Sequence, residues 1–168
     1  MPATENPALP TTANLGASLD QAAALCARRG AQLTALRREV LRLVLEAEHP
    51  VGAYALLDRL KASRAGAAPP TVYRALDFLV EQGLIHKVER LNAFIGCADA
   101  FEHPEDCGCA EQHDHPHQFL ICGRCGATAE ISDPGVALAL ARAARAAGFT
   151  PGRATVEVEG TCARCAAA

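Results

Sequence analysis

The chain has 168 residues, half of them hydrophobic and 21% charged, so it is long enough to form one medium domain or two small ones with buried cores. No apolar run approaches the roughly 18 residues of a membrane span, and the first ten residues lack the basic and apolar segments of a signal peptide. We therefore expect a cytoplasmic protein without a membrane partner.

The net charge of −3 conceals an uneven distribution along the chain. Residues 28–90 contain eleven Lys and Arg against seven Asp and Glu, whereas residues 101–168 contain five against nine. A basic first half joined to an acidic second half is typical of two modules with different functions.

The first half reads as a loose arm followed by helices and a hairpin. Residues 1–17, rich in Pro, Thr, Ala and Asn, are expected to form a flexible N-terminal arm. Apolar periodicity predicts one helix capped by Ser18, a second capped by Thr34, a third over residues 53–62 and a fourth from Pro70–Thr71. Segments 84–89 and 93–96 then predict a short hairpin. This order is that of a winged helix-turn-helix domain, assigned to residues 18–97.

The second half alternates between strands and a helix. After an acidic, loop-like stretch at 98–116, assigned as a hinge and metal-binding loop, strands are predicted at 118–122 and 127–131. An alanine-rich helix at 134–147 and an alternating strand at 154–160 follow. We therefore expect an α+β protein in which a small α/β domain occupies residues 117–168.

Two C-x-x-C pairs belong to this second domain. In a reducing compartment, cysteine pairs are more often metal ligands or redox groups than structural disulfides. Two such turns separated by one α/β unit can supply the four thiolates of a structural zinc site. The alternatives are two redox dithiols or inert buried thiols. The predicted ligands are Cys122, Cys125, Cys162 and Cys165.

The fourth helix carries the features of a DNA-recognition helix. Thr71, Tyr73 and Arg74 lie at its exposed N-terminal end, the part that such a helix inserts into the major groove. Arg74 can donate hydrogen bonds to guanine or phosphate. Tyr54, at the start of the preceding helix, can contact the DNA backbone. The alternative is that these are ordinary surface side chains.

The combined motifs resemble the ferric uptake regulator (Fur) family over about residues 18–165. They are T-V-Y-R-A-L-x-x-L-x-x-x-G-L-I with a short wing, then F-L-I-C-x-x-C-G, then C-x-x-C. The resemblance implies a homodimer with a winged helix on double-stranded DNA, an α/β dimerisation domain and a metal at the hinge. The operators it implies are AT-rich palindromes.

Within that family, the sequence resembles the zinc uptake regulator (Zur) branch. That branch has a sensory His in the wing and a Cys eleven residues after that His. It also has a His before the first C-x-x-C motif and a Glu after the same motif. The residues at those positions are His86, Cys97, His115 and Glu130. One thiolate, two imidazoles and one carboxylate form a closed tetrahedral set that suits zinc, whereas manganese prefers harder oxygen ligands.

Other potential ligands surround this set. His113 and His117 flank His115 in one alternating run, so any of the three could hold the sensory metal. His103, Cys107 and Cys109 lie in the acidic loop, where they form either a third, weaker metal site or a polar loop without a metal. We expect two Zn²⁺ per chain in addition to any such third site.

These inferences predict a zinc-responsive repressor of zinc-uptake genes. The alternative within the family is an iron- or peroxide-responsive regulator. An enzyme is not expected, because a site closed by four protein ligands leaves no open position for a catalytic water, and no small-molecule substrate is expected either.

Overall fold

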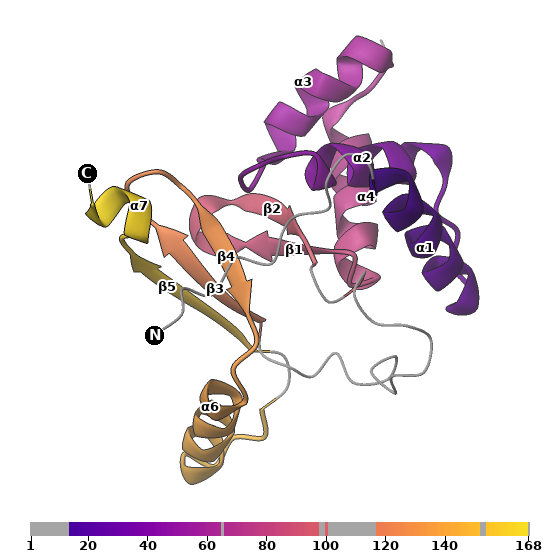
Figure 1. Ribbon diagram of the computed structural model, residues 1–168. Coiled ribbons are helices and arrows are strands. Elements are labelled where there is room, and N and C mark those ends of the chain that lie inside the picture. Colours follow the sequence, from indigo (N-terminus) through magenta and orange to yellow (C-terminus); the bar gives the residue numbers. More distant parts are fainter. Residues whose placement is uncertain (1–13, 65, 98–99, 101–116, 152–153, 168) are drawn as a thin grey trace. The chain divides into compact units, whose positions relative to one another are not determined.

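The computed structural model describes residues 14–64, 66–97, 100, 117–151 and 154–167. The chain divides into two units, Met1–His103 and Pro104–Ala168, and their elements are labelled in Figure 1. Among the described residues, no helix is long and apolar enough to cross a membrane. The predicted α+β class is confirmed.

Among the described residues of the first unit, four long helices contribute to one apolar core. These are α1 (Leu15–Arg28), α2 (Ala35–Leu45), α3 (Ala53–Ser63) and α4 (Pro69–Glu81). Each places leucine, valine or alanine side chains at helical spacing into that core. Cys26 is fully buried there, and burial raises the pKa of its thiol, as expected of a packing side chain.

The first helix starts earlier than the sequence predicts. α1 begins at Leu15, with Asn14 at the N-cap position, so Ser18 lies inside the helix. The Ser18 hydroxyl donates to the Asn14 carbonyl oxygen at 3.2 Å, one turn back, instead of capping free N–H groups. The prediction that Ser18 caps α1 was therefore wrong, and residues 15–17 belong to the helix.

The second helix begins where its capping residue predicts. The side chain of Thr34 accepts from the backbone N–H of Arg37, and the helix begins at the next residue, Ala35.

A two-stranded hairpin follows α4. β1 (Ile85–Val88) pairs antiparallel with β2 (Ala93–Gly96), and the short 3-10 helix η1 (Glu89–Leu91) connects them. Asn92 completes the reversal in the left-handed region, with φ of 45°. Val51, just before α3, bridges to Phe94 and so ties the hairpin to the helices. The predicted winged helix-turn-helix is confirmed.

The second unit contains a three-stranded sheet in the order β4-β3-β5. The strands are β3 (His117–Cys122), β4 (Thr128–Ile131) and β5 (Thr155–Gly160); β3 is antiparallel to β4 and parallel to β5. The antiparallel strand β4 returns the chain to the end of the sheet where β3 begins, and helix α6 (Pro134–Ala146), capped by the Asp133 carboxylate, connects the end of β4 to the start of β5.

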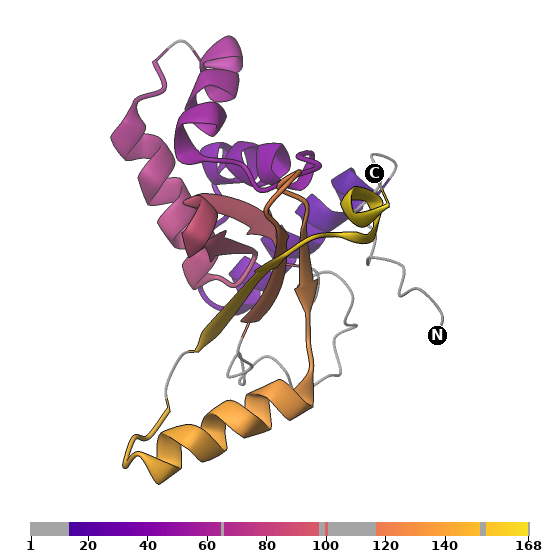
Figure 2. The ribbon, with the colours of Figure 1, turned by 90° about the vertical axis from the view of Figure 1, so that its left-hand side faces the viewer.

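Figure 2 shows the positions of the two helices of this unit around its sheet. α6 lies beyond the end of the sheet where β4 ends and β5 begins, and the short helix α7 (Ala163–Ala166) lies at the opposite end. No residue of α6 is buried in the single chain. The four-residue helix α7 was not predicted from the sequence.

Candidate metal and DNA-binding sites

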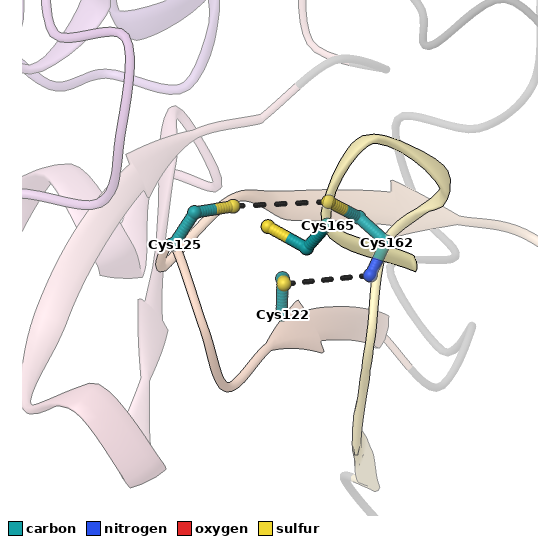
Figure 3. A group of neighbouring side chains, drawn as sticks. All are labelled: Cys122, Cys125, Cys162 and Cys165. Atoms are coloured by element: carbon teal, nitrogen blue, oxygen red, sulfur yellow. Dashed lines mark hydrogen bonds between the residues drawn. The ribbon is translucent and has the colours of Figure 1, made fainter. Parts of the chain in front are cut away.

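The two C-x-x-C pairs come together at one end of the second unit. Cys122 ends β3, Cys125 belongs to the following turn, Cys162 precedes α7 and Cys165 lies within it (Figure 3). Their sulfur atoms all lie within 4.8 Å of one another, so residues about forty positions apart in the sequence form one cluster.

Backbone hydrogen bonds hold this cluster together. Parallel pairing sets Cys122 opposite Gly160, and the Gly123 N–H donates to the Gly160 carbonyl oxygen at 3.0 Å. The Cys162 N–H points at the Cys122 sulfur at 3.4 Å. Gly126 turns the first loop with φ of 72°, a conformation that favours glycine.

The electrostatics of the cluster favour a cation. The N–H groups of Cys162, Cys125 and Arg124 lower the pKa of the Cys122 thiol to about 6. In contrast, the thiols of Cys125 and Cys162 raise the pKa of Cys165 to about 12. Four thiolates at such short range repel one another, so full ionisation requires a positive ion among them.

The spacing of the sulfur atoms suits zinc. A tetrahedral zinc with Zn–S bonds of about 2.3 Å places its sulfur ligands about 3.8 Å apart. The sulfur atoms of Cys125 and Cys162 are 3.8 Å apart. The residues present therefore fit a Zn(Cys)₄ centre.

The wing of the first unit contains a second pair of metal-binding side chains. His86 lies in β1 opposite Ile95 of β2, and Cys97 directly follows β2. The Cys97 N–H donates to the Leu84 carbonyl oxygen at 3.1 Å, which extends the hairpin by one bond. Both side chains are buried, and their ligand atoms lie within 4.8 Å of each other. An imidazole and a thiol so placed can supply two ligands to one metal ion.

The other predicted sensory ligands belong to the second unit or lie outside the described residues. Glu130 is in β4, and its Oε1 lies 3.4 Å from Nδ1 of His117, the first residue of β3. The predicted ligands that lie outside the described residues are His103, Cys107, Cys109, His113 and His115.

The residues predicted to contact DNA lie on α3 and α4. Tyr54 is 69% exposed and Tyr73 41% exposed. Arg74 is also exposed, and Thr71 is half-buried. The buried side of α4, formed by Val72, Ala75, Leu76 and Leu79, packs on the core. The first two turns of α4 therefore present polar side chains on a rigidly packed helix.

Two arginines that the sequence did not single out anchor the other end of α4. The Arg37 guanidinium lies 3.5 Å from the centroid of the Phe78 ring. The Arg29 guanidinium donates to the Gln82 carbonyl oxygen at 2.5 Å, at the C-terminus of α4, where cations are favoured. Helical periodicity places Arg37 outside the apolar face of α2 but cannot reveal its cation–π contact, because Phe78 is on another helix.

The sequence comparisons agree on one family. Residues 28–159 match the ferric uptake regulator family. The chain is 42% identical over 147 residues to the zinc uptake regulation protein of Escherichia coli (strain K12), which covers 88% of this chain and 80% of that protein. It is 29% identical over 139 residues to the zinc uptake regulation protein of Mycobacterium tuberculosis (strain H37Rv), covering 81% and 95% respectively.

Solved structures show the same similarity. The holo form of XcZur is 45% identical, with a TM-score of 0.76 and coverage of 90% of this chain and 99% of that one. A zinc uptake regulator complexed with zinc and DNA is 39% identical, with a TM-score of 0.79 and coverage of 94% and 97%.

Proposed function

Because this chain belongs to the ferric uptake regulator family, we propose that it is a zinc-responsive, DNA-binding transcriptional repressor of zinc-uptake genes. The observation that carries the proposal is the buried pair of His86 and Cys97 in the wing. A thiolate beside an imidazole favours zinc over harder metal ions. The identity of 42% to a zinc uptake regulation protein supports the same metal and disfavours an iron or peroxide sensor.

The Zn(Cys)₄ centre has a structural role in this proposal. The unfolded chain offers no preformed site, so metal binding contributes directly to the folding of the second unit. Cys162 and Cys165 hold α7 against the turn between β3 and β4.

The second centre has the regulatory role. His86 and Cys97 supply two ligands from the first unit, and His115 and Glu130 supply two from the second. These four residues would hold a zinc ion as a cross-link and would leave no open position for a substrate, so no catalysis is proposed. Because the ligands come from both units, the chain would adopt its DNA-binding conformation only when zinc is available.

DNA recognition is assigned to the N-terminal half of α4. Arg74 and Tyr73 reach base edges or phosphates in the major groove. Thr71 and Tyr54 contact the DNA backbone. Zinc and DNA favour the same conformation, so each increases the affinity for the other. The operator is proposed to be an AT-rich palindrome bound by a cytoplasmic homodimer.

An uncovered apolar surface in the second unit supports the homodimer. Leu120 and Val158 are neighbours on one face of the sheet, in register and 44% and 50% exposed. Leu138 and Leu140 of α6 are also exposed. Apolar surface of this kind favours burial against a second copy.

The proposal predicts that Cys97→Ser abolishes zinc-dependent DNA binding and leaves a folded dimer. Serine removes the thiolate from the regulatory ligand set while the Zn(Cys)₄ centre stays intact. DNA binding titrated against buffered zinc, iron and manganese measures the effect, and metal analysis should give two zinc per wild-type chain and one per variant. Normal zinc-dependent binding by the variant would exclude Cys97 as a sensory ligand.

A further inference from the structure

His117 and Glu130 form a polar pair across two strands of the second unit. Nδ1 of His117 lies 3.4 Å from Oε1 of Glu130. This distance is slightly longer than the usual N–H···O range of about 2.7–3.2 Å, and short enough for electrostatic attraction to a carboxylate. The Glu130 side chain is only 9% exposed and that of His117 is 24% exposed.

The strand register explains why these two side chains meet. Glu130 lies opposite Phe119, and His117 precedes Phe119 by two residues in β3. All three side chains therefore project from the same face of the sheet, with His117 and Glu130 as diagonal neighbours. The pair is set by the sheet and not by a loop.

A neighbouring aromatic ring restricts the orientation of the imidazole. The rings of His117 and Phe119 are stacked, with centroids 6.5 Å apart and planes inclined by 23°. Phe119 is itself 1% exposed, so its ring is held in place by packing. A histidine held against a packed ring can present Nδ1–H in one fixed direction.

We infer that His117 is a positioning residue that orients the Glu130 carboxylate for the regulatory zinc. A carboxylate that binds a metal through one oxygen commonly accepts a hydrogen bond on the other, and such partners strengthen metal binding. Because Nδ1 of His117 faces the carboxylate, that nitrogen does not ligate zinc. This inference rests on the proposed regulatory site.

The experiment compares His117→Ala with His117→Asn in the full-length chain. Alanine removes the donor, so the affinity for the second zinc should fall about tenfold to a hundredfold, with two zinc still bound per chain at saturation. Asparagine retains an amide N–H near the position of Nδ1 and should restore most of the affinity. Zinc competition with a chromophoric chelator measures both values.

Cobalt substitution tests whether His117 acts through Glu130 or is itself a ligand. A positioning residue leaves the ligand set unchanged, so the visible Co²⁺ spectrum of the regulatory site should be the same in His117→Ala and wild type. A changed spectrum would make His117 a direct ligand and overturn the inference. Equal losses of affinity in the alanine and asparagine variants, or wild-type affinity in both, would also overturn it.

Glu130→Ala separates this inference from the proposed function. If that variant binds the second zinc with wild-type affinity, Glu130 is not a ligand and the proposed regulatory site is itself wrong. If it loses the second zinc while His117→Ala does not weaken binding, the site stands and only the role of His117 fails.

Discussion

Among single residues, Gly96 determines how closely the wing approaches the helical core. A Cβ atom at this position would lie 2.5 Å from Cδ2 of Leu45, a side chain that is 2% exposed. The next residue is Cys97, so the same close approach positions a proposed zinc ligand. Glycine is needed here for space, and not for an unusual backbone angle.

We expect Gly96→Ala to lower the free energy of unfolding by about 1–3 kcal/mol, because Leu45 must move within a packed core. Urea denaturation measures the change. Gly16→Ala is the matched control, since nothing lies within 4 Å of a Cβ at Gly16 in α1; that variant should be as stable as wild type or slightly more so. Wild-type stability of Gly96→Ala would contradict the packing argument.

Among the elements, α4 is held by two kinds of contact, apolar packing along one side and arginine contacts at its C-terminal half. Its apolar side packs on α2 and α3, while Arg29, just after α1, and Arg37 of α2 contact its C-terminal half. The N-terminal half, with Tyr73 and Arg74, remains exposed. A helix anchored in this way can present side chains to a groove without a large entropic cost on binding.

We expect Arg74→Ala to weaken operator binding by about 1–3 kcal/mol, roughly tenfold to a hundredfold, through loss of a base or phosphate contact. Electrophoretic mobility shifts at saturating zinc measure the affinity. Arg28→Ala removes the same charge from the exposed end of α1 and should leave binding unchanged. Equal affinities for the Arg74→Ala protein and wild type would rule out Arg74 as a DNA contact.

The position of α7 depends on the zinc centre that Cys162 and Cys165 share with Cys122. We therefore expect Cys122→Ser to lose the structural zinc and to unfold or monomerise the protein. Circular dichroism, metal analysis and sedimentation would detect these changes. Cys26→Ser, a thiol substitution in the first unit, is the control and should keep the structural zinc. A stable dimeric Cys122→Ser protein would refute the structural role of the Zn(Cys)₄ centre.

At the scale of the whole molecule, the described residues of the second unit expose several large apolar side chains. α6 buries none of its residues, although its sequence has the apolar periodicity of a packed helix. Phe149, just after α6, is 73% exposed. Burial of these side chains against a second copy, as in the proposed homodimer, would stabilise them.

We therefore expect Leu138→Asp to shift the protein from dimer to monomer, because it places a charge on that surface. Sedimentation at several protein concentrations measures the equilibrium. Leu91→Asp, at a 38% exposed leucine of the wing, is the matched control and should remain dimeric. An unchanged dimer in Leu138→Asp would show that α6 lies outside the interface.

The helices of the first unit, the hairpin and the two C-x-x-C turns were predictable from the sequence, because each depends on local periodicity or spacing. The start of α1 was missed because Ser18 can bond either to N–H groups ahead of it or to a carbonyl one turn back. The choice depends on packing, and Ser18 is buried inside the helix.

The pairing of the strands, in contrast, is visible only in the folded protein. The two motifs predicted that Cys122 and Cys162 share a site, but they did not show that β5 pairs parallel to β3 to bring them together. The contact of His117 with Glu130 was not predicted, because it depends on the register between β3 and β4. The Arg37–Phe78 contact likewise joins two helices. Strand order and register are fixed by the packing of entire faces, and no short sequence window contains that information.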